Sequence, residues 1–218
     1  MGTVTIAATY GAGGSVVAPA VARRLGLTLI DRAIAPELAA KMDMPLRAAL
    51  ESDEDRGRGV NRVLEWALTA GGLFVGVPPA PEALGAEDDI ARTESMLHRL
   101  ADAEGAVILG RAGVFVLQGR SDTLHVRLDG PVEARRRQAM TQRHLDYETV
   151  SREQEQADRA RRAYVEHFHP RQRDWTDIRN YHLVIDSTVV SLETCVELIA
   201  RAAGDAFRHA HPHVVQPE

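Results

Sequence analysis

Cysteine is nearly absent from this chain, and long apolar runs are missing. The single cysteine, Cys195, excludes an intrachain disulfide framework, and such scarcity is typical of proteins from a reducing compartment. Its helical-looking surroundings, LETCVELIARAAG, favour a role as a small buried apolar residue. No apolar run approaches the roughly 20 residues that cross a bilayer, and the start of the chain lacks the basic segment of a signal peptide. We therefore expect a cytoplasmic protein with no membrane partner.

Positive charge is not in excess either. Lys and Arg number 26 against 31 Asp and Glu, which gives a formal net charge of −5 at pH 7. Sequence-independent nucleic-acid binding needs a broad basic face, so we expect no nucleic-acid partner. One stretch is nevertheless rich in arginine, and it either faces a local anionic ligand or forms solvated helix surface laced with Glu and Asp. Its arginines are Arg127, Arg135, Arg136, Arg137, Arg143, Arg152, Arg159, Arg161, Arg162, Arg171, Arg173 and Arg179.

Short apolar runs alternate with helical patterns along the chain, whose 218 residues suit one domain. This alternation predicts an α/β fold with a parallel sheet and right-handed crossovers. The predicted strands are residues 3–8, 27–30, 106–109, 123–128 and 182–185. The predicted helices begin after the first strand and include residues 34–42, 44–50, 60–69, 90–103, 133–140, 150–167 and 192–207, while residues 71–89 form a long Gly/Pro-rich loop.

A glycine-rich loop connects the first predicted strand to a helical run. It consists of Gly11, Ala12, Gly13, Gly14 and Ser15. Glycines allow successive backbone N–H groups to point into one concavity, and the start of the following helix adds positive potential. We interpret this segment as a phosphate-binding loop. The alternative is a tight strand-to-helix turn without a ligand.

Polar residues follow each of the other predicted strands. They are Asp31 with Arg32, then Arg111, Asp129 and Asp186. Ligands of parallel sheets bind beyond the carboxyl ends of the strands, so we expect these residues to converge with the glycine loop. Asp129 also stands where an N-cap of the next helix is expected.

The order of these motifs resembles that of cytidylate-kinase-like proteins. ATYGAGGSVVAPAVARRLGLTLIDR is similar to their phosphate loop, helix, short strand and Asp-Arg pair, and VILGRAGVFVLQGRSDTLHVRLDGPVEARRR, ADRARRAY and NYHLVIDST are similar to later segments. The resemblance implies a P-loop NTPase three-layer fold, with a five-stranded parallel sheet, helices on both faces and a helical lid. It implies a single domain over residues 1–218, with a core at about 1–42, 90–141 and 181–209, a variable insert on the monophosphate side at about 43–89 and a lid at about 142–180.

The resemblance also implies ATP-dependent phosphoryl transfer to a nucleoside monophosphate, with Mg²⁺ as the metal. The loop from Gly11 to Ser15 would cradle the ATP phosphates. Asp31 and Arg32 would face the monophosphate pocket, and Arg111 would bind a phosphate as one of the catalytic residues.

Two further catalytic residues are implied by the lid segment. Asp158 and Arg161 are spaced as D-x-x-R and would contact the nucleotide ribose and phosphate. On a helix this spacing lets both reach one ligand, although an ordinary exposed ion pair gives the same pattern. We expect the lid to close over the bound nucleotide.

The chain departs from the usual phosphate loop at several positions. Gly14 stands where the standard loop has its lysine, Val16 stands where a hydroxyl would hold Mg²⁺, and Ser15 replaces an arginine frequent in the family. Two hypotheses follow: a cytidylate-like kinase, which we favour, or a non-catalytic nucleotide-binding relative that acts as a sensor or partner-binding subunit. The acceptor monophosphate and the oligomeric state stay open.

Other candidate sites have less support. The histidines near residues 167–169 and 209–213 have no acidic or cysteine partner at ligand spacing, so we expect no protein metal site. Trp175 and Tyr181 could flank a base, but a core role fits them better.

Overall fold

The computed structural model describes residues 2–30, 94–95, 97–110, 112–169 and 174–210. Three of the predicted site residues, Asp31, Arg32 and Arg111, lie outside this part of the chain. So do the helices predicted over 34–42, 44–50 and 60–69 and the loop predicted over 71–89.

Five strands form one parallel sheet. They are β1 (Thr3–Ala8), β2 (Thr28–Ile30), β3 (Ala106–Leu109), β4 (Thr123–Asp129) and β5 (Leu183–Asp186). Their order in the sheet is β2-β3-β1-β4-β5, and every neighbouring pair is parallel. The five predicted strands are confirmed to within one residue at each end. Because β1 is the central strand, the loop that follows it opens at the middle of the carboxyl edge of the sheet.

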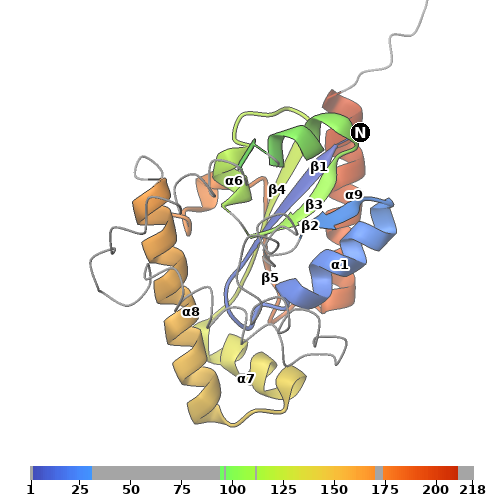
Figure 1. Ribbon diagram of the computed structural model, residues 1–218. Coiled ribbons are helices and arrows are strands. Elements are labelled where there is room, and N and C mark those ends of the chain that lie inside the picture. Colours follow the sequence, from blue (N-terminus) through green and yellow to red (C-terminus); the bar gives the residue numbers. More distant parts are fainter. Residues whose placement is uncertain (1, 31–93, 96, 111, 170–173, 211–218) are drawn as a thin grey trace, which may run out of the picture.

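Helices cover both faces of the sheet (Figure 1). They are α1 (Gly14–Leu25), α6 (Gly113–Val116), α7 (Val132–Arg143), α8 (Tyr147–Phe168) and α9 (Leu192–Ala210), with a 3-10 turn at Ile178–Asn180 and a further helical stretch over residues 97–103. α1 ends where predicted, because Gly26 adopts the left-handed conformation and its N–H binds the last carbonyls of the helix. Among these helices none is long and apolar enough to cross a membrane.

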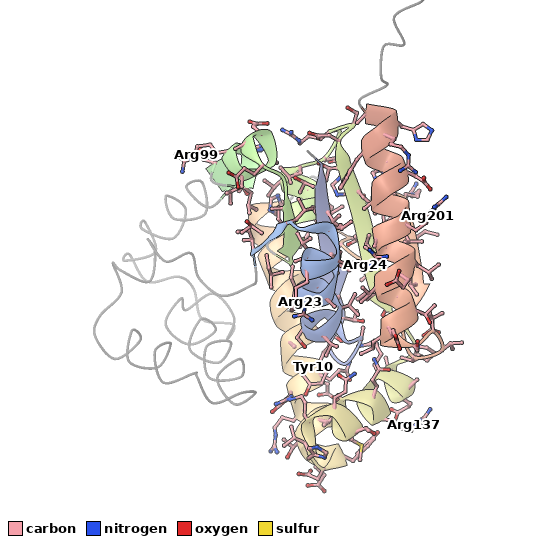
Figure 2. The ribbon with its side chains drawn as sticks, turned by 90° about the vertical axis from the view of Figure 1, so that its right-hand side faces the viewer. Tyr10, Arg23, Arg24, Arg99, Arg137 and Arg201 are labelled. Atoms are coloured by element: carbon pink, nitrogen blue, oxygen red, sulfur yellow. The ribbon has the colours of Figure 1, made fainter. Side chains whose placement is uncertain are left out.

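The face of the sheet under α1 and α9 is apolar. Alternate side chains of β1 and β4 form its centre together with both helices, and the two helices lie side by side over it (Figure 2). Cys195 is fully buried in this core, as expected, and burial raises the pKa of its thiol. The buried residues are Val4, Ile6, Ala8, Ala12, Val17, Ala18, Val21, Ala22, Val107, Leu109, Leu124, Val126, Leu128, Ile185, Cys195, Ile199 and Ala203.

The opposite face carries a buried polar stripe across β1 and β4. Thr5 pairs in register with His125, and Ala7 pairs with Arg127. The Thr5 hydroxyl and His125 Nδ1 are 2.7 Å apart. Beyond Arg127 the stripe ends in Asp129, at the carboxyl edge of β4. The second face of the sheet therefore carries polar contacts from its interior to the edge where the glycine loop opens.

His125 should make the protein sensitive to mild acid. Burial, together with the positive charge that His182 can carry, lowers the pKa of His125 from 6.5 to about 4. The unfolded chain binds a proton below pH 6.5 and the folded chain does so only near pH 4, so stability is lost as the pH falls between these values. We expect the free energy of unfolding to drop by about 2 kcal/mol between pH 7 and pH 5 from this residue alone.

Urea denaturation at the two pH values measures this loss. His125→Phe, which is similar in size and does not titrate, should show a correspondingly smaller loss. An equal loss in the variant would assign the acid sensitivity to other groups.

Candidate functional site

The glycine loop leaves the centre of the sheet and turns directly into α1. Gly11 and Gly13 have left-handed φ angles of 79° and 74°, and α1 begins at Gly14 with no side-chain cap. Within the described part of the chain, no group accepts a hydrogen bond from the N–H groups of Gly13, Gly14 or Ser15. Such first-turn donors have no partner inside their own helix. The predicted phosphate loop therefore has the backbone form of an anion site.

The underside of the loop is tied to the rest of the protein through its carbonyl oxygens. Arg135 Nη1 donates to the carbonyl of Tyr10 at 2.7 Å, and Gln138 Nε2 donates to that of Gly11 at 3.0 Å. The Ser187 hydroxyl, just beyond β5, donates to the carbonyl of Ala12 at 2.9 Å. These contacts join α7 and the start of the β5–α9 connection to the loop.

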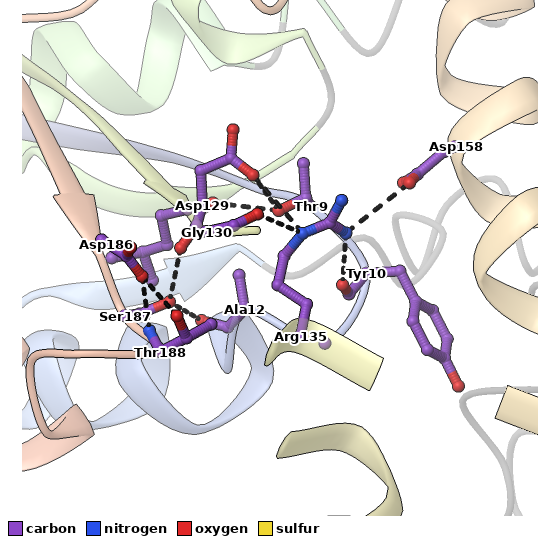
Figure 3. A network of polar contacts seen from close by, with 12 residues as sticks. Thr9, Tyr10, Ala12, Asp129, Gly130, Arg135, Asp158, Asp186, Ser187 and Thr188 are labelled. Carbon is purple, nitrogen blue, oxygen red and sulfur yellow. Dashed lines mark hydrogen bonds and ion pairs between the residues drawn. The ribbon is translucent and has the colours of Figure 1, made fainter. Parts of the chain in front are cut away.

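Asp129 is the centre of a charged network at the carboxyl edge of β4 (Figure 3). Its Oδ2 accepts hydrogen bonds from Arg127 Nε and Nη2 at 3.1 and 2.6 Å, and its Oδ1 accepts one from the Thr9 hydroxyl at 2.8 Å. Arg135 Nε lies 3.6 Å from Oδ1. Burial alone would raise the pKa of Asp129, but the Arg127 hydrogen bonds and charge outweigh it and hold the pKa below its usual value. Asp129 is therefore ionised and bound on both oxygens.

The expected N-cap role of Asp129 is wrong. The helix that follows, α7, begins at Val132 with Pro131 at its N-cap and no side-chain cap bond. Asp129 is instead the last residue of β4, and its carboxylate is already taken by Arg127 and Thr9.

Asp158 of the predicted D-x-x-R pair approaches this network from α8. Its Oδ2 lies 3.6 Å from Arg135 Nη1 and accepts a hydrogen bond from Gln154 Nε2 at 2.7 Å. The structure thus brings Asp158 to the loop through Arg135, as Figure 3 shows. The side chain of Arg161 is not among those described, and the nucleotide contacts expected of Asp158 and Arg161 stay predictions.

Tyr10 gives the loop a second attachment to α7 and α8. Its hydroxyl donates to Glu153 Oε2 at 2.6 Å, and Arg143 Nη1 contacts both the Tyr10 hydroxyl and the Glu153 carboxylate. Burial raises the pKa of Tyr10, and the hydrogen bond to Glu153 raises it further. The phenol therefore stays protonated and can serve as a donor throughout the physiological range.

Among the described residues, two buried arginines lie close to the loop. Arg127 and Arg135 are 3% and 4% exposed, so neither belongs to a solvated helix face. Arg127 also donates to the carbonyl of Trp175 at 3.0 Å, and its guanidinium lies 4.7 Å from the centre of the Trp175 ring. Both cations face carboxylates of the protein itself. Trp175 and Tyr181 are buried with Val114, Phe115 and Val165, which confirms their core role.

Sequence reasoning named these arginines but missed their roles. The signal for Arg127 was the alternation of polar and apolar residues in TLHVRLD, which is typical of a strand with two different faces. The contributions of Thr9, Gln138 and Ser187 depend on the tertiary structure and leave no comparable pattern. In the described ranges no cluster of three or more His, Cys, Asp or Glu residues is placed to hold a metal ion.

Comparison with known proteins places this arrangement in a family. The sequence profile of the cytidylate kinase-like family matches residues 3–189. The chain belongs to the cytidylate kinase-like family. No curated protein matches the chain.

Solved structures similar to this cytidylate kinase-like protein match it over nearly its whole length. An uncharacterized protein from Eubacterium ventriosum ATCC 27560 is 16% identical with a TM-score of 0.64, over 94% of this chain and 99% of that one. A sugar kinase from Janibacter sp. HTCC2649 is 16% identical with a TM-score of 0.49, over 98% and 99%. A shikimate kinase from Acinetobacter baumannii, in complex with shikimate, is 13% identical with a TM-score of 0.48, over 94% of each chain. Together with the parallel sheet and the loop after β1, the family assignment gives the P-loop fold of phosphoryl-transfer kinases.

Proposed function

We propose that this protein transfers a phosphoryl group from ATP to a nucleoside monophosphate, in the manner of a cytidylate kinase. The observation that carries the proposal is the loop after β1, where left-handed Gly11 and Gly13 lead into the uncapped start of α1. The N–H groups of Gly13, Gly14 and Ser15 suit phosphate oxygens. ATP would supply the transferred group, with Mg²⁺ neutralising its phosphates.

Mg²⁺ would be held mainly by the nucleotide and less by the protein. Mg²⁺ in phosphoryl-transfer sites is held largely by phosphate oxygens and water. The exposed Ser15 hydroxyl in the first turn of α1 is a protein oxygen that would join them. The cytoplasmic location favoured by the lone cysteine belongs to the same proposal.

Exposed valines beside the loop favour a nucleotide over free phosphate. Val16, Val132 and Val189 are 50%, 43% and 81% exposed, and they lie just beyond the carboxyl ends of β1, β4 and β5. The segments after β4 and β5 touch each other, because a Cβ on Gly130 would stand 2.6 Å from the Thr188 side chain. Apolar side chains near an anion site suit a base attached to a phosphate.

A non-catalytic nucleotide-binding protein, acting as a sensor or partner-binding subunit, is the second candidate. It is favoured by Gly14 in place of the loop lysine and by the pairing of Arg127 and Arg135 with carboxylates. Arginines that are already paired with carboxylates add little net positive charge to neutralise the phosphoryl group during its transfer. Catalysis would then depend on Arg32, Arg111 or Arg161.

One coupled phosphotransfer assay separates the two candidates. ATP and Mg²⁺ are supplied with each common ribonucleoside and deoxyribonucleoside monophosphate in turn, and ADP release is followed. Turnover that requires one monophosphate, with CMP the expected acceptor, supports the kinase. Calorimetric ATP binding without turnover for any acceptor supports the sensor, and absence of both contradicts both candidates.

Arg111→Ala should weaken nucleotide binding. Gly110 and Ala112, its described neighbours, lie at the carboxyl end of β3, and the residue matches the Gly-Arg motif of the family. Loss of a charge-assisted contact to phosphate should cost about 1.5–3 kcal/mol of binding free energy. Calorimetry with ATP and CMP measures it. Arg99→Ala is the control, since Figure 2 shows Arg99 at the opposite end of the molecule from Tyr10, and equal affinities of the two variants would remove Arg111 from the site.

A further inference from the structure

The protein binds the carbonyl oxygens of the phosphate loop, whereas the N–H groups of Gly13, Gly14 and Ser15 have no acceptor in the described part of the chain. Every carbonyl from Thr9 to Gly13 accepts a hydrogen bond from the chain. Two of these carbonyls are bound locally: the N–H of Ala12 donates to Thr9, and those of Val16 and Val17 donate to Gly13. The three carbonyls between them are bound by side chains from other elements, namely Tyr10 by Arg135, Gly11 by Gln138 and Ala12 by Ser187.

Within the described residues the loop carbonyls are bound and the N–H groups of Gly13, Gly14 and Ser15 are not, so the bound carbonyls set the direction in which the N–H groups of the loop point. A peptide unit is planar and trans, so its carbonyl and its N–H point to opposite sides. When Ser187 holds the carbonyl of Ala12 on the inside, the N–H of Gly13 in the same peptide unit must face away from it. Peptide rotation next to glycine is otherwise inexpensive, because glycine occupies positive and negative φ with similar ease. A loop with three glycines therefore needs external contacts to keep its N–H groups in one orientation.

The contribution of Arg135 to this arrangement is geometric. Its guanidinium lies 3.6 Å from both Asp129 and Asp158 and also donates to the carbonyl of Gly130 at 2.9 Å. Two carboxylates balance its charge, so it cannot stand in electrostatically for the missing lysine. Gln138 and Ser187 are neutral and can act only by position.

We propose that Arg135, Gln138 and Ser187 are positioning residues that form a carbonyl clamp on the phosphate loop. The clamp holds three successive carbonyls inward and thereby fixes the N–H groups of Gly11, Ala12 and Gly13, which share their peptide units. The N–H of Ala12 donates to Thr9 and closes the turn, and the N–H of Gly13 is left to meet a phosphate. Preorganisation of this kind lowers the cost of binding, and it offsets part of what a loop lysine provides by charge. The inference deepens the proposed function and rests on the binding of ATP phosphates to this loop.

Two neutral substitutions test the clamp without disturbing its ion pairs. Gln138→Met keeps the length of the side chain and removes its donor, and Ser187→Ala removes a single hydroxyl. Each should weaken the binding of ATP and of inorganic pyrophosphate about 5-fold, the effect of one neutral hydrogen bond. Gln142→Met, one turn further along α7, and Ser121→Ala, in the turn before β4, are exposed matched controls that should bind as the unmodified protein does.

The measurement separates positioning from loss of stability. Affinity is determined by calorimetry well below the thermal midpoint of each variant, where the population is folded and lower stability alone leaves the affinity unchanged. Arg135→Lys keeps the positive charge that lies between the two carboxylates, and it keeps a hydrogen-bond donor. Its affinity for ATP should therefore stay within about 3-fold of that of the unmodified protein, while Arg135→Met should bind ATP about 10-fold or more weakly.

The outcomes distinguish the clamp from the function on which it rests. If the unmodified protein binds ATP and pyrophosphate but Gln138→Met and Ser187→Ala bind as tightly as their controls, the clamp is wrong and the proposed function stands. If the unmodified protein binds neither probe, the proposed function is wrong, and the clamp, which depends on it, is wrong as well. Selective weakening in the two variants, with unchanged controls, supports both.

Discussion

Gly11→Ala should weaken ATP binding at least about 100-fold, the value of two charge-assisted hydrogen bonds. A Cβ at Gly11 would stand 2.3 Å from the backbone carbonyl oxygen of Arg135, in the first turn of α7. Backbone atoms of a helix cannot yield as the end of a flexible side chain can. The loop must therefore move away from α7, and its outward N–H groups lose their alignment. Calorimetric titration with ATP measures the loss.

Gly26→Ala is the matched control for this prediction. Gly26 also has a left-handed φ, 68°, but a Cβ there would meet nothing within 4 Å, and the residue lies at the far end of α1. Each substitution carries a backbone strain of about 1–2 kcal/mol, so both variants should be somewhat less stable. Only Gly11→Ala should lose affinity for ATP. Equal ATP affinities of the two variants would show that the loop does not form the site.

Arg127→Met should reduce the free energy of unfolding by about 3–5 kcal/mol, the range for one partner removed from a buried ion pair. The substitution takes two hydrogen bonds from Asp129, one from the carbonyl of Trp175, and the guanidinium from beside the Trp175 ring. Asp129 then keeps Thr9, the backbone N–H of Gly130 and the more distant Arg135. Urea denaturation at pH 7 measures the change.

Two comparisons isolate the buried pair. Arg179→Met breaks an ion pair to Asp177 in which the arginine side chain is 87% exposed, and it should leave stability nearly unchanged. The double variant Arg127→Met with Asp129→Asn removes both charges and should regain part of the lost stability. A loss below about 1 kcal/mol in Arg127→Met would contradict the inward, stabilising role assigned to this arginine.

The first 30 residues could be predicted closely from the sequence because several local signals agree there. An apolar run predicts β1, the glycines mark the turn, and Gly26 ends α1 in the left-handed conformation that glycine favours. The same agreement holds at β3 and β5. The family resemblance supplied what local patterns could not, namely that the loop after β1 belongs to a P-loop kinase fold.

The buried charges could not be predicted because their burial is decided by the sheet and by helical phase. Of three consecutive arginines, Arg135 is buried, Arg136 is partly buried and Arg137 is exposed, and only the orientation of α7 against the loop sets this order. Arg127 is likewise buried because β4 presents it beside Asp129 on the inner polar stripe. Charged residues at buried strand positions indicate a buried ion pair, but only the three-dimensional structure identifies the residue that pairs with each charge.

The central claim is that the backbone of the glycine loop binds phosphate, and the amide resonances of Gly11, Gly13, Gly14 and Ser15 test it most directly. ¹⁵N-labelled protein is titrated with ATP and, in parallel, with adenosine, which lacks phosphate. The account predicts that ATP produces the largest shifts of the protein at the amides of Gly13, Gly14 and Ser15, and that adenosine leaves them nearly unchanged. Unmoved loop amides at ATP concentrations that saturate binding would contradict it.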